Sequence, residues 1–188
     1  MADRDNRPTD PEGGGGKEDA GKVIREGSDA PESHRATAMD RTAPPLDDLY
    51  REVVLDHFRR PRGREPLAHP DCNVEGFNPS CGDQIHLALS AAGRQVTDIQ
   101  VECHGCSISV ASGSMMAEMI PGHDVAEVRR LIEAVKGMMQ GRQPDPAVDL
   151  GDVEALEGVR KFPVRVKCAL LAWTTLEEAL PRIEEQAG

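Results

Sequence analysis

The chain has 188 residues, with 22 Lys and Arg against 33 Asp and Glu and a net charge of −11 at neutral pH. This length is sufficient for one folded domain and an additional segment. The acidic balance and only five scattered aromatic residues argue against a nucleic-acid partner. No apolar run reaches transmembrane length and no apolar signal core stands at the N-terminus, so we expect a cytoplasmic protein that does not bind membranes.

Residues 1–45 are rich in Asp, Glu, Gly and Pro and contain few side chains that a core could bury. Such a segment cannot offset the entropy lost on ordering, so the composition predicts a disordered N-terminal tail. Its 10 acidic and 7 basic residues leave 23 acidic and 15 basic residues for a folded domain over 46–188, a net charge of −8.

The first half of this domain predicts a helix followed by strands. Apolar residues recur at helical spacing over 46–58, and His57 on that apolar face is expected to be a core or boundary histidine rather than a ligand. A loop follows, with a short strand near 74–77. Over 85–89 and 99–103 apolar and polar residues alternate, and the turn "SAAGR" joins the two segments into an antiparallel hairpin.

Helical segments follow the hairpin. The stretch "SISVASGSMMAEMI" is typical of a helix that ends at Pro121, and Asp124 with Glu127 predicts a capping box for the next helix. "VEALEGV" predicts a short helical piece, and apolar spacing over 166–180 predicts a last helix with Pro181 near its end. Together the elements predict an α+β domain: a small antiparallel β-sheet packed with several helices on one side.

The five cysteines are an odd number, which favours metal binding or thiol chemistry over disulfides in a chain that looks cytosolic. They are Cys72, Cys81, Cys103, Cys106 and Cys168. Cys81 and Asp83 stand two residues apart in "NPSCGDQIH", where a loop enters the first hairpin strand. In an extended chain, such residues project to the same side and can reach one object.

Two more cysteines are expected at the same edge of the sheet. Cys106 lies just past the second hairpin strand, where a helix N-terminus favours the thiolate, and Cys168 lies in the first turns of the last helix. Three thiols and one carboxylate complete a tetrahedral zinc site. The candidate metal ligands are therefore Cys81, Asp83, Cys106 and Cys168.

The sequence is also compatible with an alternative zinc site. "CHGC" at 103–106 is a common zinc pattern and could join Cys72 and Cys81 in a site made of cysteines alone. Against this, Cys103 continues the inward alternation of its strand and is expected to lie in the core as a small hydrophobe. Cys72 has no partner at metal-site spacing.

Residues 46–180 resemble the SufU branch of the IscU/SufU (NifU N-terminal-like) iron–sulfur cluster assembly family. The resemblance rests on five motifs in the family's order: "LYREVVLDHFRRPRG", "NPSCGDQI", "GCSISVASGSMM", "MMQG" with "DLGDVEALEGV", and "KFPVRVKCALLAW". The family's metal ligands, three cysteines and an aspartate, map onto Cys81, Asp83, Cys106 and Cys168. Cys72 and Cys103 fall outside that pattern.

Three features distinguish the chain from IscU proper. Cys168 follows Cys106 by 62 residues, an interval lengthened by the SufU-type insertion around "DLGDVEALEGV". Lys167 stands before the last cysteine, where IscU has a histidine. "KFPVRVKC" replaces the proline-rich motif that chaperones recognise in IscU, so no chaperone partner is carried over.

The resemblance implies a zinc-dependent sulfur carrier, and thus a sulfurtransferase, in which Cys81 accepts persulfide sulfur. The implied partners are a SufS-type cysteine desulfurase and the downstream iron–sulfur assembly machinery. Arg165 is a candidate catalytic cation that pairs with Asp83 or the persulfide. Two alternatives remain: a scaffold that binds iron or an iron–sulfur cluster on the same cysteines, and a structural zinc module.

Overall fold

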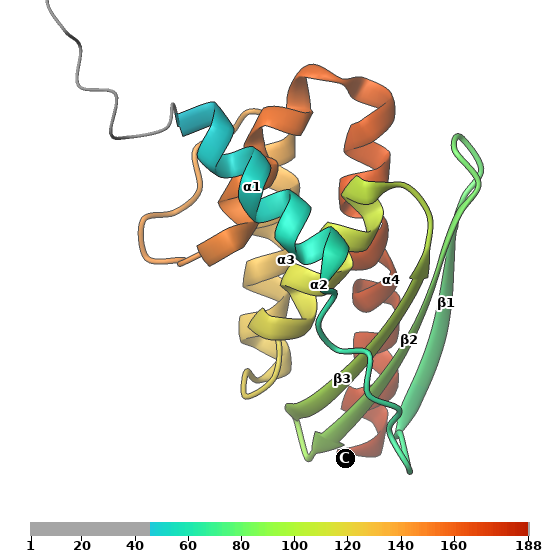
Figure 1. The fold of residues 1–188 in the computed structure, drawn as a ribbon. Helices are drawn as coiled ribbons and strands as arrows, with labels where there is room; N and C mark the ends of the chain where they lie inside the picture. Colours follow the sequence, from blue (N-terminus) through green and yellow to red (C-terminus); the bar gives the residue numbers. More distant parts are fainter. Residues whose placement is uncertain (1–45, 188) are drawn as a thin grey trace, which may run out of the picture. The chain divides into compact units, whose positions relative to one another are not determined.

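The computed structural model describes residues 46–187, and the disordered tail expected over 1–45 lies outside them. One helix precedes a three-stranded sheet in this part of the chain, and the other helices follow the sheet (Figure 1). The elements are α1 (Leu46–Arg59), β1 (Cys72–Asn78), β2 (Asp83–Ala92), β3 (Gln95–His104), α2 (Ser107–Met119), α3 (Val125–Met139), the 3₁₀ helix η1 (Gly151–Lys161) and α4 (Pro163–Gln186).

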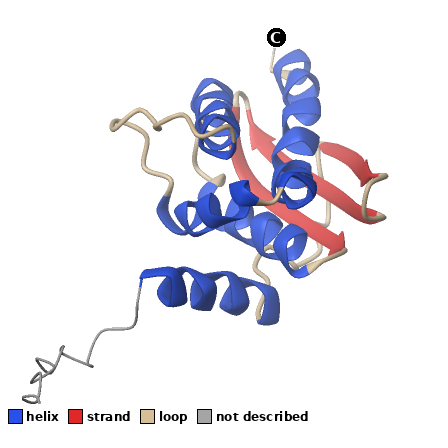
Figure 2. Cartoon of the chain, turned by 90° about the horizontal axis from the view of Figure 1, so that it is seen from above, coloured by secondary structure: helices blue, strands red, loops and turns tan. Residues whose placement is uncertain are grey.

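The sheet is antiparallel with the strand order β1-β2-β3, and one of its faces is covered by helices (Figure 2). In β2 the alternate residues Ile85, Leu87 and Leu89 are buried under those helices, as their period of two predicts. The opposite face carries exposed polar residues, Glu75, Gln84 and Glu102, together with the exposed Phe77. The α+β architecture with helices on one side is confirmed.

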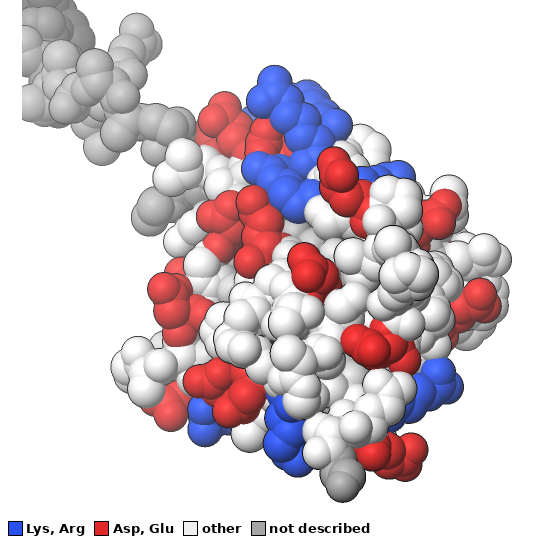
Figure 3. Space-filling view, turned by 90° about the horizontal axis from the view of Figure 1, so that it is seen from below, with Lys and Arg blue, Asp and Glu red and all other residues white. Residues whose placement is uncertain are grey.

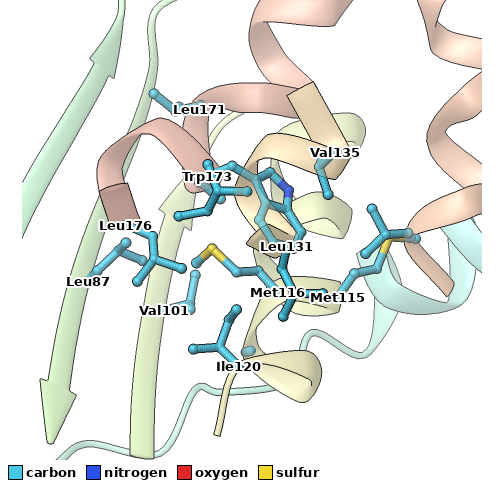
Figure 4. Close-up of a cluster of buried hydrophobic side chains, with 14 of the residues drawn as sticks. Leu87, Val101, Met115, Met116, Ile120, Leu131, Val135, Leu171, Trp173 and Leu176 are labelled. Atoms are coloured by element: carbon cyan, nitrogen blue, oxygen red, sulfur yellow. The ribbon is translucent and has the colours of Figure 1, made fainter. Parts of the chain in front are cut away.

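The core is organised around Trp173 of α4, which is fully buried among side chains from the sheet, α2 and α3 (Figure 4). A buried indole N–H needs a partner. Its Nε1 donates to the Ser112 hydroxyl at 3.0 Å, and that hydroxyl donates to the Ala169 carbonyl at 2.6 Å. Polar groups in the middle of the core are thus satisfied while α2 and α4 are held together.

The start of α3 has the hydrogen bonds that its sequence predicts. The Asp124 carboxylate accepts from the Glu127 N–H at 2.8 Å, and the Glu127 carboxylate accepts from the Asp124 N–H at 2.9 Å. The predicted capping box is therefore confirmed. The short helical piece expected around "VEALEGV" is the 3₁₀ helix η1, whose buried residues are Val153, Ala155, Leu156 and Val159.

The last helix has Pro181 near its end, as expected. It continues through Pro181 to Gln186, although proline removes a helical hydrogen bond. Ile183, beyond the proline, is buried, and the Arg182 guanidinium donates to the Asn73 carbonyl of β1 at 2.7 Å. Packing of the final turns against the sheet compensates for the missing bond, so the helix does not end at the proline.

The surface of the described part carries charge of both signs. Acidic side chains are spread over the face in Figure 3, and basic side chains gather mainly toward one edge of it. This face therefore lacks the continuous basic surface that a nucleic-acid backbone requires. Within residues 46–187, no helix combines the length and apolar composition needed to cross a bilayer.

Replacing Trp173 with alanine should lower the free energy of unfolding by about 3–5 kcal/mol, because a large cavity forms and the Ser112 hydroxyl loses a partner. Chemical denaturation followed by circular dichroism measures the loss. Val164→Ala, in the same helix but 60% exposed, should change the free energy by less than about 0.5 kcal/mol. Equal losses in the two variants would contradict this view of the core.

Candidate metal centre

A turn joins β1 to β2 and presents Cys81. The backbone N–H groups of Cys81 and Gly82 donate to the Asn78 carbonyl at 3.3 and 2.9 Å, and Gly82 has a φ of +76°, which glycine adopts at little cost. Cys81 is exposed on this turn, and Asp83 begins β2. The expectation of an extended chain here is wrong, because the turn bends the backbone between Cys81 and Asp83.

The Asp83 carboxylate is only 3% exposed and is held by the start of α2. Its Oδ1 accepts from the Cys106 backbone N–H at 3.0 Å, and its Oδ2 accepts from the Ser109 hydroxyl. Burial alone raises the pKa of Asp83. Hydrogen bonds from Cys81, Ser109 and the Cys106 N–H outweigh burial and lower the pKa to about 2. Asp83 is therefore ionised at neutral pH, as a metal ligand must be.

Gly105 leaves the space that this carboxylate occupies. A Cβ atom added at Gly105 would lie 2.6 Å from Cγ and 2.7 Å from Oδ1 of Asp83, closer than Cβ atoms normally approach any other atom. A side chain at this position would force the carboxylate to move. The absence of a side chain at Gly105 is thus part of the site.

Cys168 brings a buried sulfur to the exposed turn. It is 2% exposed, and its Sγ lies 3.3 Å from the Cys81 Sγ. The Asn78 side-chain amide donates to Cys168 Sγ at 3.6 Å, and the Cys168 thiol donates to the Val164 carbonyl at 3.7 Å. Burial raises the pKa of the Cys168 thiol, and hydrogen bonding within the cluster raises it further. The thiolate therefore requires a cation, and binding one must release the proton.

Three of the four expected ligands converge directly. The ligand atoms of Cys81, Asp83 and Cys168 all lie within 4.8 Å of one another. Cys106 is half-buried, and its Sγ lies 3.6 Å from the Ser109 hydroxyl. Hydrogen bonding with Cys106 also raises the pKa of Cys168, so the Cys106 thiol lies beside the cluster. The arrangement offers three sulfurs and one oxygen at one end of the sheet.

The site made of cysteines alone does not form in this structure. Cys72 lies opposite Leu89, at the far end of β1 from the turn, with its Sγ 4.0 Å from the Ala179 carbonyl. Cys103 is buried against the helices, and burial raises the pKa of its thiol to about 12. The sulfurs of Cys72 and Cys103 therefore behave as core atoms, as expected for Cys103.

Two basic side chains lie near the start of α4. The Arg165 guanidinium lies 5.4 Å from the centroid of the Phe162 ring, and no ion pair joins Arg165 to Asp83 within the described residues. The Lys167 ammonium donates to the Ser80 hydroxyl at 3.2 Å and so connects α4 to the residue preceding Cys81. Lys167 is thus the basic side chain that contacts the turn.

Three residues that hold the ligands in place were not predicted from the sequence: Asn78, Gly105 and Ser109. "GCSIS" carries a weak signal for two of them, because a glycine precedes the N-cap and a serine occupies the first turn of a helix. Side chains at such positions commonly hydrogen-bond to nearby backbone. The contact of Ser109 with the Asp83 carboxylate joins residues that are 26 positions apart in the sequence, so it has no local signature.

Comparisons with known proteins give one consistent result. The family described as NifU-like N terminal domain matches residues 49–180. The zinc-dependent sulfurtransferase SufU of Bacillus subtilis is 45% identical over 139 residues, which cover 74% of this chain and 94% of the relative. The iron–sulfur cluster assembly scaffold protein IscU of Streptococcus pyogenes serotype M1 is 39% identical. That match covers 73% of this chain and 86% of the relative.

A solved structure agrees with these matches. It is described as a cluster assembly scaffold protein for the SUF system of Fervidobacterium islandicum AW-1 and superimposes with a TM-score of 0.66 at 34% sequence identity. The match covers 72% of this chain and 99% of the other. The fold and the sequence thus point to the same group of proteins.

Gly105→Ala should weaken zinc binding at least about tenfold, because the new methyl group displaces the Asp83 carboxylate. Competition with a chromophoric chelator measures the affinity. Gly158→Ala is the matched control, since an added Cβ there meets no atom within 4 Å. Unchanged zinc affinity in Gly105→Ala would show that the position of Asp83 does not matter for the metal.

The low pKa of Asp83 should make metal-free protein sensitive to acid. Because the folded pKa is about 2 and the ordinary value is 3.8, ionised Asp83 stabilises the fold above about pH 4, and this contribution is lost as the pH falls through 2. The difference in unfolding free energy between wild type and Asp83→Asn should shrink by about 2 kcal/mol between pH 6 and pH 2. Urea denaturation with a chelator present measures it.

The control for this measurement is Asp98→Asn, which removes an exposed carboxylate from β3. Its difference from wild type should stay nearly constant over the same pH range. A difference for Asp83→Asn that also stays constant would mean that the carboxylate is not preferentially ionised in the folded protein.

Proposed function

The chain belongs to the family of NifU-like N-terminal domains, and from this we propose that it is a zinc-dependent sulfur carrier that accepts persulfide sulfur from a cysteine desulfurase on Cys81. The observation that carries the proposal is the unequal exposure of the ligands. Cys81 is exposed on its turn, whereas Asp83 and Cys168 are buried beneath it. A thiol that must react with another protein has to be accessible, and its fixed neighbours need not be.

The donor set fits zinc. Cys81, Cys106 and Cys168 supply sulfur and Asp83 supplies oxygen, a combination suited to a borderline-soft ion with four ligands. Bound zinc keeps thiols as thiolates at neutral pH and has no redox chemistry of its own. The ionised Asp83 and the high pKa of Cys168 support this assignment, since both indicate a site that gains from a cation.

The transfer itself is a thiol exchange. The Cys81 thiolate attacks the terminal sulfur of the desulfurase persulfide, a new S–S bond forms on Cys81, and the desulfurase cysteine leaves as a thiolate. The rate follows the thiolate fraction and the accessibility of Cys81. The Cys81 persulfide then passes the same sulfur to the downstream iron–sulfur assembly machinery. The similarity to the sulfurtransferase of Bacillus subtilis supports this role.

Apolar side chains beside the site support contact with a SufS-type desulfurase. Phe77 precedes the Cys81 turn and is 59% exposed, while Phe162 and Val164 precede Cys168 and are 54% and 60% exposed. Exposed apolar surface next to a reactive group is typical of a protein-binding surface. Arg165, stacked over Phe162, lies in this surface, and we assign it to binding the partner or its persulfide rather than to pairing with Asp83.

A scaffold is the second candidate, because the relative in Streptococcus pyogenes carries that name and the same three sulfurs could bind a cluster. A scaffold must accept iron and sulfide at this site, whereas a carrier must retain zinc while Cys81 gains sulfur. A structural zinc module is the third candidate, and it requires that removal of the metal unfolds the domain and that no thiol is reactive.

Zinc-loaded protein incubated with its cysteine desulfurase and cysteine should gain the mass of one sulfur atom on Cys81, measured by intact-mass spectrometry and peptide mapping. Cys81→Ser should gain none even where zinc remains bound. Cys72→Ala, which removes a buried thiol outside the site, should gain sulfur as wild type does. Sulfur uptake by Cys81→Ser, or none by wild type with an active desulfurase, would refute the carrier.

A further inference from the structure

A second group of donor atoms lies where α1, α2 and η1 meet. The Nε2 of His57 is 3.0 Å from Oδ2 of Asp152 and 3.7 Å from Oε2 of Glu118. The three ligand atoms lie within 4.8 Å of one another, although the residues come from distant parts of the sequence. We propose that His57, Glu118 and Asp152 form a second metal site, which binds a divalent first-row transition metal ion through one nitrogen and two oxygens.

The distances suit such an ion. Bonds of about 2.0–2.2 Å place neighbouring ligands about 2.9 Å apart in octahedral geometry and about 3.4 Å apart in tetrahedral geometry. The two observed distances of 3.0 and 3.7 Å lie near these values. The carboxylate side chains of Glu118 and Asp152 are 49% and 59% exposed, so they are free to adjust by a few tenths of an ångström.

The His57 ring is already oriented for ligation. Its Nδ1 lies 2.8 Å from the Ser114 hydroxyl oxygen, which also accepts from the Arg62 backbone N–H at 2.9 Å. The hydroxyl can accept from Nδ1–H or donate to Nδ1, so the contact fixes the plane of the ring for either tautomer. Nε2 points at the Asp152 carboxylate, to which it donates when it carries the proton. A metal ion would displace that proton, and histidine ligands are commonly oriented by a hydrogen bond at the other ring nitrogen.

Burial holds the His57 ring in this orientation, because the residue is 1% exposed. A metal ion would take the place of a proton on Nε2. Arg62 neutralises the outer part of the cluster, since its Nε lies 3.3 Å from Oε1 of Glu118. His57 is the only basic group within ion-pair distance of Asp152 among the described residues. One divalent ion would balance the two carboxylates beside a neutral imidazole.

The site has an entry path and room for water. An adjoining cavity of about 340 Å³ is lined by Glu118 and Asp152, and also by His123 and Asp149. An ion that enters from this side would complete its coordination shell with solvent molecules. The set of donors contains no thiol, so it suits harder ions than the cysteine site does.

The order of contacts Ser114–His57–Asp152 also resembles a hydrolytic triad, but the serine is unsuitable as a nucleophile. Ser114 is 1% exposed in the interior of α2, and its oxygen is occupied by His57 and Arg62. A substrate cannot reach it. The exposed side of the cluster is formed by Glu118 and Asp152, which is the side where an ion would bind.

The test uses the full chain, first loaded with one equivalent of zinc and then dialysed against Co²⁺ as the probe. Elemental analysis should find one cobalt per chain in addition to zinc, without the thiolate-to-cobalt charge-transfer absorption that marks a cysteine site. Asp152→Asn should lower the cobalt affinity at least about tenfold. Its exposed side chain makes this variant safer for folding than any change at buried His57.

Asp149→Asn is the matched control, because Asp149 lines the same cavity but is not one of the three ligands. It should bind cobalt as wild type does. A purely structural pairing of His57 with Asp152 would lower the melting temperature of metal-free Asp152→Asn without any cobalt uptake by wild type, which overturns the proposal. Cobalt uptake accompanied by charge-transfer absorption and zinc release, or equal affinities in wild type and Asp152→Asn, also overturns it.

Discussion

The buried, ionised carboxylate of Asp83 is the constraint on which the functional end of the molecule depends. It lies on the covered face of the sheet, where a charge is tolerated only if hydrogen bonds replace water. The first turn of α2 provides these bonds through the Cys106 N–H and the Ser109 hydroxyl, and Gly105 allows the close approach. The β1–β2 turn and the start of α2 are therefore locked together, with Cys81 and Cys106 beside them.

The core positions the remaining sulfur. Cys168 lies about 1.4 turns before Trp173 in α4, and the tryptophan is fixed between the sheet and α2 by packing and by its hydrogen bond to Ser112. Cys168 and Asp83 thus belong to the rigid interior, and Cys81 stands on an exposed turn above them. This division suits a carrier in which one thiol reacts with a partner protein while its neighbours stay in place.

The two candidate metal sites differ in chemistry and in the segments that they join. The first is rich in sulfur and connects the sheet to α2 and α4, whereas the second uses His57 with two carboxylates and connects η1 to α1 and α2. The η1 segment contains most of "DLGDVEALEGV", the stretch that the resemblance predicts to be an insertion of the SufU branch. A metal ion at the second site would hold η1 to the rest of the domain, separately from the proposed sulfur transfer at Cys81.

The amino-acid sequence by itself determined the helices, the hairpin, the capping box at Asp124 and the cysteines available for a metal, because these follow from local periodicity and residue chemistry. Only the tertiary structure decided which side chains meet. The contact of Ser109 with Asp83, that of His57 with Asp152 across 95 residues, and the continuation of α4 through Pro181 all depend on packing between distant segments. Burial and hydrogen bonding arise only from that packing, so they cannot be inferred from local patterns.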